Sequence, residues 1–262
     1  MSTDTLLAAC GMAGEAALIL LLVRMRTYRT LPAFFTYLCW SLVDDGAVLA
    51  LQGLPFKTYF RIYEIQMVVD AALVFAVLVE LAWSVLRPLR DSLPKQSWIG
   101  IALIIAFAGL VVWPVAGLTV PPHLSSTGQV FFRLQQTFAI LRVVVFFAMA
   151  AFSQLIGIGW RSRELQVATG LGFYSILSLA VTVVHAHQLS GTQSYHWLDE
   201  AETAGYLGTL TYWVYAFATK EAERQNFSPQ MANFLLLIGG TARASRVALT
   251  DFSVTKSRFK DH

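Results

Sequence analysis

Seven long apolar segments constrain this chain more than any other feature. Of its 262 residues, 56% are hydrophobic and only 13% are charged, against about 25% charged in a soluble domain. Each segment has the ~20 residues that a helix needs to cross the hydrocarbon of a bilayer. The sequence therefore predicts an all-α integral membrane protein with seven transmembrane helices. The expected spans are Thr5–Val23, Leu31–Leu54, Tyr59–Leu86, Trp98–Leu118, Val130–Ile158, Leu165–Leu189 and Ala201–Thr219.

The basic residues predict the orientation of the bundle, because cytosolic connections are rich in lysine and arginine. One set of span ends carries only Lys57, Arg61 and Arg133, and the expected loop at 190–200 carries no lysine or arginine. The N-terminus is therefore expected outside and the C-terminus in the cytosol, with the protein in the inner or plasma membrane. The basic residues on the expected cytosolic side are Arg24, Arg26, Arg29, Arg87, Arg90, Lys95, Arg161, Arg163, Lys220, Arg224, Arg243, Arg246, Lys256, Arg258 and Lys260.

The chain is expected to divide into a transmembrane domain, residues 1–220, and a cytosolic tail, residues 221–262. In the tail, Ser228 precedes Pro229, which is a common way for a helix to begin. The apolar stretch that follows is too short to span a bilayer and is followed by basic residues. A helix over about 229–248 is therefore expected to lie on the anionic inner leaflet, or to dock a protein partner.

The fourth segment differs from its neighbours because it contains no ionisable residue between Lys95 and His123. We therefore expect it to face lipid. The second and sixth segments share a pattern, in which an arginine precedes an aromatic–serine pair by about eleven residues. The pair is Trp40–Ser41 in the second segment and Tyr174–Ser175 in the sixth. Helices one to three and five to seven would then be two parallel repeats joined by helix four. That topology resembles the sugar-carrier SWEET proteins, although none of their sequence motifs is found, and the resemblance implies transport.

Polar residues within the expected spans recur at helical spacing, so each set lines one face of its helix. Lipid cannot satisfy such faces, which are therefore expected to point at one another inside the bundle. The sets are Tyr37, Ser41, Asp44 and Asp45; Tyr59, Tyr63, Gln66 and Asp70; Gln135, Arg142 and Ser153; Tyr174, Ser178 and His185; and Glu202, Tyr206, Thr209 and Trp213.

Three of these residues, Asp45, Asp70 and Arg142, carry charge near the middle of the membrane, where an unpaired charge costs at least ~2.5–3.5 kcal/mol. One carboxylate is expected to accept hydrogen bonds from Arg142 as its direct partner, which leaves the other carboxylates to water, a tyrosine, a cation or a proton. Glu15 and Glu80 add to this excess. The expected ligand-binding residues are Asp44, Asp45, Asp70 and Arg142 at the deep end of a cavity, and Tyr63, Tyr174, His185 and Tyr206 along its entrance route.

The sequence favours binding of a small polar or cationic ligand from the outer side, for transport or sensing. One alternative is a non-enzymatic subunit of a larger complex, in which the charges are structural and the tail docks a partner. Another is a metal-dependent enzyme that uses the outer histidines, but His185 and His187 lie about 200° apart on a helix and do not face one ion together. The chain contains no G-x-S-x-G, phosphate-loop or H-E-x-x-H motif. An enzyme is therefore the less favoured class of protein. The sequence does not identify a cofactor. No nucleic-acid partner is expected.

Overall fold

The computed structural model describes residues 3–51, 56–85, 96–120, 125–156, 162–187 and 193–219, and within these ranges every regular element is helical. Five of the helices are long and apolar enough to cross a membrane, which indicates a membrane protein. The α-helices are α1 (Thr3–Arg24), α2 (Pro32–Leu51), α3 (Phe56–Val85), α4 (Ser97–Ala116), α5 (Ser126–Ile156), α6 (Arg163–His187) and α7 (Gln193–Ala218). The apolar stretches in five of them are Leu6–Arg24, Tyr59–Ser84, Ser97–Ala116, Ser126–Phe152 and Arg163–Val184.

Helix α7 begins earlier than the sequence predicted. Its first residue is Gln193 rather than Ala201, so most of the expected loop at 190–200 is helical. Because no proline or glycine lies between Gln193 and Gly205, nothing in the sequence interrupts helical hydrogen bonding there. The other six helices begin and end within a few residues of their predicted bounds. The predicted tail helix at 229–248 lies outside the described residues.

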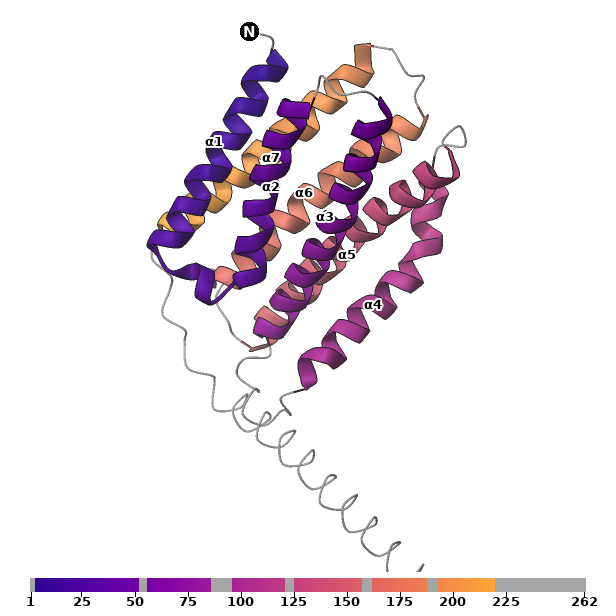
Figure 1. Ribbon diagram of the computed structural model, residues 1–262. Helices are drawn as coiled ribbons and strands as arrows, with labels where there is room; N and C mark the ends of the chain where they lie inside the picture. Colours follow the sequence, from indigo (N-terminus) through magenta and orange to yellow (C-terminus); the bar gives the residue numbers. More distant parts are fainter. Residues whose placement is uncertain are drawn as a thin grey trace, which may run out of the picture.

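The helices form two layers with α4 at one edge (Figure 1). Helices α1, α2 and α3 follow one another in one layer, and α5, α6 and α7 follow one another in the second. The layers meet where α1 packs against α7 and where α3 packs against α5, while α4 packs against α3 and α5 from outside. The described side chains of α4 are mostly exposed and apolar, including Leu103, Phe107 and Leu110, which agrees with its expected lipid-facing role. The relation of the two layers as sequence repeats stays a prediction.

The two ends of the bundle differ in packing. We call the end that holds the first residues of α1, α3, α5 and α7 the upper half, as it stands in Figure 1, and the other end the lower half. The largest fully buried apolar side chains all belong to the lower half. They are Phe34, Phe217, Leu18, Leu22, Leu31, Leu38, Leu78, Leu81, Leu165, Leu210 and Val77.

Aromatic contacts between α2 and α7 form the centre of this lower core. The ring of Phe34 meets the ring of Trp213 edge-on at a centroid distance of 5.1 Å and stacks on Phe217 at 6.3 Å. Trp213 also donates a hydrogen bond from Nε1 to the carbonyl of Gln166 at 3.2 Å. A Cβ atom at Gly170 would clash with Trp213, so α6 and α7 can approach this closely only because residue 170 is glycine.

Two charged side chains in the lower half cap helix ends by forming hydrogen bonds with backbone groups there. Glu80 of α3 accepts hydrogen bonds from the backbone N–H groups of Ala33 and Phe34, each at 2.9 Å, at the start of α2. Arg163 of α6 donates to the carbonyls of Ala216 and Thr219, at 2.7 and 2.9 Å, at the end of α7. Helix ends leave such amides and carbonyls without intrahelical partners, and their dipoles favour these charges.

Candidate functional site

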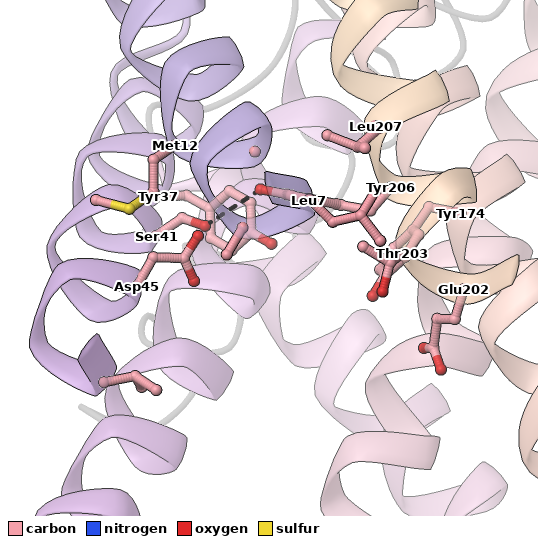
Figure 2. Close-up of a pocket in the computed structure, with 13 residues that line it drawn as sticks. Leu7, Met12, Tyr37, Ser41, Asp45, Tyr174, Glu202, Thr203, Tyr206 and Leu207 are labelled. Atoms are coloured by element: carbon pink, nitrogen blue, oxygen red, sulfur yellow. Dashed lines mark hydrogen bonds between the residues drawn. The ribbon is translucent and has the colours of Figure 1, made fainter. Parts of the chain in front are cut away.

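A cavity of about 540 Å³ extends from the middle of the bundle into the upper half, between α1, α2, α6 and α7. We call it the α2–α7 pocket (Figure 2). Asp45 reaches it from α2 and Glu202 from the opposite side on α7, with Tyr174 and Tyr206 between them. No lysine, arginine or histidine is found among the described residues that line it. The lining residues are Leu7, Ala8, Gly11, Met12, Tyr37, Ser41, Asp45, Val48, Tyr174, Glu202, Thr203, Tyr206 and Leu207.

Glu15 of α1 supports the wall of this pocket from behind. Its side chain is 0% exposed, and its Oε1 atom accepts hydrogen bonds from Ser41 Oγ at 2.6 Å and from the Tyr206 hydroxyl. The Ser41 and Tyr206 oxygens are themselves 3.5 Å apart (Figure 2). The other carboxyl oxygen, Oε2, is buried and has no hydrogen-bond partner among the described residues. Glu15 thereby fixes a serine of α2 and a tyrosine of α7 in one orientation toward the pocket.

The opposite wall is held by contacts between α6 and α7. Ser178 Oγ donates a hydrogen bond to Glu202 Oε1 at 2.5 Å. One turn away on α6, the ring of Tyr174 meets that of Tyr206 edge-on at 5.6 Å. These contacts hold a carboxylate and two aromatic rings around the same space.

A second cavity, of about 360 Å³, lies on the other side of α2, between α2, α3 and α5. We call it the α3–α5 pocket. Two carboxylates, Asp44 and Asp70, and one guanidinium, Arg142, open into it. Val48 of α2 lines both pockets. The lining residues are Asp44, Val48, Tyr59, Tyr63, Gln66, Met67, Asp70, Ala71, Val74, Leu134, Gln135, Phe138 and Arg142.

Arg142 does not make the direct ion pair that the sequence predicted. Among the described residues, no carboxylate lies within 4.0 Å of its guanidinium, and its Nε atom is buried without a hydrogen-bond partner. Its Cζ atom lies instead 6.0 Å from the centre of the Tyr174 ring, in a cation–π arrangement. Asp44 of α2 and Asp70 of α3 line the same cavity as Arg142.

The predicted single cavity is thus two pockets separated by α2. Asp44 and Asp45 are consecutive, so their side chains leave the helix about 100° apart and enter different spaces. The α2–α7 pocket takes Asp45 with Tyr174 and Tyr206, and the α3–α5 pocket takes Asp44 with Asp70, Arg142 and Tyr63. The side chain of His185, the remaining predicted residue, lies outside the described part of the structure.

The prediction of the site did not include Glu15, Tyr37, Ser41 or Glu202. Glu15 is the single charged residue within the apolar run of α1, and this is the sequence feature that could have indicated a role in the site. Its partners come from α2 and α7, which are remote in sequence. Their contact with α1 depends on how the helices are ordered and rotated, which helical spacing within one segment does not determine.

The described residues contain no group of three or more histidine, cysteine, aspartate or glutamate side chains arranged to hold a metal ion. The side chains of His185 and His187, named in the metal hypothesis, lie outside those residues. Comparison with models of protein families, with curated proteins and with solved structures finds no match. The chemistry of the two pockets is therefore the basis for a functional proposal.

Proposed function

We propose that all seven helices cross the inner or plasma membrane, with the N-terminus outside and the tail in the cytosol. The distribution of lysine and arginine supports this orientation. Both pockets extend toward the end of the bundle that holds the N-terminus, so this orientation opens them to the outer side. A cysteine at Trp197, an exposed residue near the start of α7, should react with an impermeant thiol reagent in intact cells. Protection of that cysteine in intact cells, with labelling only after lysis, would reverse the orientation.

We propose further that the protein binds a small organic cation in the α2–α7 pocket, as the first step of uptake or sensing. The observation that carries this proposal is the composition of the pocket wall: Asp45, Glu202 and three tyrosines, without a basic residue among the described lining residues. Carboxylates attract a cation electrostatically, and the faces of tyrosine rings attract it through their quadrupoles by ~0.5–2 kcal/mol each. Hydroxyl groups of the same tyrosines can accept hydrogen bonds from an ammonium group.

The size of the pocket fits this class of ligand. Its volume of about 540 Å³ lies within the range of ~300–1,000 Å³ that is typical of small-molecule sites. Leu7, Met12 and Leu207 add apolar surface for the carbon atoms of an alkylammonium group. Because Glu15 fixes Ser41 and Tyr206 without ligand, part of the wall is preorganised, which reduces the ordering needed on binding.

Choline is a suitable probe, because its neutral isostere, 3,3-dimethylbutan-1-ol, has the same shape without the charge. A ligand that binds the folded state stabilises it by RT ln(1 + [L]/Kd). Choline should therefore raise the unfolding temperature of the purified protein in lipid nanodiscs, and the isostere should not. An equal response to both compounds, or none to either, would reject cation binding in this pocket and favour the structural-subunit alternative.

Two variants locate the effect. Asp45→Asn and Glu202→Gln each remove a pocket charge and should weaken choline binding at least ~10-fold. Glu200→Gln is the matched control, because Glu200 is exposed on α7 and does not line the pocket. A loss of binding that is equal in all three variants would indicate general attraction to an acidic surface rather than a site.

A further inference from the structure

The α3–α5 pocket contains unmatched charges of both signs. Asp44 and Arg142 each have a buried polar atom, Oδ1 and Nε respectively, without a hydrogen-bond partner among the described residues. Asp70 is exposed to the same cavity from α3. Within the described residues, none of these three groups forms an ion pair within 4.0 Å. A structural salt bridge would close the distance between its members, whereas here a cavity of about 360 Å³ lies between helices α2, α3 and α5.

We propose that the α3–α5 pocket is a second binding site, distinct from the α2–α7 pocket, and that it takes an α-amino acid with an apolar side chain. The ammonium group of the ligand would lie near Asp44 and Asp70, and its carboxylate would lie against Arg142. The planar guanidinium of arginine suits a carboxylate because it can donate two parallel hydrogen bonds.

The charge pattern selects a zwitterion over a simple ion. A ligand with only a positive group would match the aspartates but would share the cavity with the unpaired guanidinium of Arg142. A ligand with only a negative group would match Arg142 but would be repelled by two carboxylates. A molecule with both groups satisfies both sets, and interactions between charges are strengthened away from bulk water.

The remaining walls select the side chain of the ligand. Apolar groups from three helices line the rest of the cavity, and Gln66 and Gln135 provide additional polar groups. A branched or aromatic apolar side chain would therefore find more complementary surface than a charged one. The apolar lining residues are Val48, Met67, Ala71, Val74, Leu134 and Phe138.

The two pockets differ in the sign of the groups they present. Arg142 lines the α3–α5 pocket only, and its guanidinium reaches the α2–α7 pocket indirectly, through the face of Tyr174. A carboxylate-bearing ligand thus has a charged donor in the α3–α5 pocket, whereas the described lining of the α2–α7 pocket offers it only carboxylates and hydroxyls. This difference allows the two sites to be tested independently.

L-Leucine and two fragments of it form a matched set of probes. 3-Methylbutylamine is leucine without the carboxylate, and 4-methylpentanoate is leucine without the ammonium group. Because 3-methylbutylamine is itself a small organic cation, the comparison uses the Asp45→Asn/Glu202→Gln double variant, in which both carboxylates of the α2–α7 pocket are neutral. This variant in nanodiscs should be stabilised against heat by L-leucine, with at least ~10-fold weaker apparent binding of either fragment. L-Valine, L-methionine and L-phenylalanine extend the panel to other apolar side chains.

The variants Arg142→Gln and Asp70→Asn should each reduce the response to the best amino acid at least ~10-fold. Arg61→Gln, at an exposed position on α3, is the matched control and should keep the response. No stabilisation of the wild-type protein by any of the four amino acids would overturn the proposal, as would a response of the Asp45→Asn/Glu202→Gln double variant to 3-methylbutylamine equal to its response to L-leucine. Since choline binding is measured separately, its failure and the failure of amino-acid binding are distinguishable.

Discussion

The two halves of the bundle accommodate charge in opposite ways. In the lower half, Glu80 and Arg163 lie next to helix ends, and each is hydrogen-bonded to backbone groups that the helices leave free. In the upper half and the middle, Asp44, Asp45 and Arg142 lie along helices and open into pockets. The fully buried apolar core coincides with the first arrangement and the pockets with the second.

The difference follows from the availability of backbone partners. A helix leaves about four N–H groups and four carbonyls free at its two ends and none in its middle. A carboxylate near a helix start can therefore be satisfied by the backbone, as Glu80 is. A carboxylate in the middle of a helix can be satisfied only by another side chain, by water or by a ligand. Charges in mid-helix without side-chain partners are thus the ones that we associate with binding.

The largest expected effect is on the lower core. Phe34→Ala removes a fully buried ring that contacts Trp213 and Phe217, and should lower the free energy of unfolding by ~3–5 kcal/mol. Phe107→Ala, at an exposed position on α4, is the control for loss of a phenyl ring. Chemical denaturation in mixed micelles measures both. If the two variants lose similar stability, the lower half is not the packed core of the bundle.

The next effect concerns the capped end of α2. Glu80→Ala leaves the N–H groups of Ala33 and Phe34 without their acceptor and should lower the free energy of unfolding by ~1.5–3 kcal/mol. Glu80→Gln keeps one acceptor oxygen and should lose less. Glu200→Ala, on the exposed surface of α7, provides the baseline for removing a glutamate. If Glu80→Ala and Glu200→Ala have the same free energy of unfolding, the structural role of the Glu80 carboxylate is contradicted.

A smaller effect is expected in the wall of the α2–α7 pocket. Tyr206→Phe removes one of the two hydroxyls that donate to Glu15 and should lower the free energy of unfolding by about 1 kcal/mol, since Ser41 still donates. Tyr215→Phe, on an exposed position of the same helix, is the control. A loss as large as that of Phe34→Ala would mean that the upper half is as structural as the lower half.

The smallest effect on stability is expected for the pocket carboxylate itself. Asp45→Asn should leave the free energy of unfolding within ~0.5 kcal/mol of wild type, because Asp45 makes no hydrogen bond or ion pair with the described residues. Its effect should instead be on ligand binding. A large loss of stability in the same denaturation assay would show that Asp45 stabilises the fold, as Glu80 does, and would contradict its assignment to ligand binding.

Helical spacing predicted the helices and several of the residues that line the two pockets, and the limits of that prediction are equally physical. Periodicity places Tyr174 and Tyr206 on polar faces, and the structure brings both rings to one pocket. Spacing within a segment does not determine which helices are neighbours, so it missed that Glu15 of α1 meets Tyr206 of α7. It also grouped Asp44 with Asp45, although the ~100° between consecutive residues sends them to different cavities.

Thiol reactivity tests most directly whether the upper half is open to cations while the lower half is sealed. In protein with Cys10 and Cys39 replaced by serine, Ser41→Cys would line the α2–α7 pocket, and Leu38→Cys would lie one turn lower on α2 in the buried core. A quaternary-ammonium methanethiosulfonate should modify Ser41→Cys at least ~10-fold faster than its anionic sulfonate counterpart, because clefts lined by charge of one sign concentrate the opposite ion. Leu38→Cys should react slowly with both reagents. Equal reactivity at the two positions, or a preference of Ser41→Cys for the anionic reagent, would contradict an open, cation-attracting upper half.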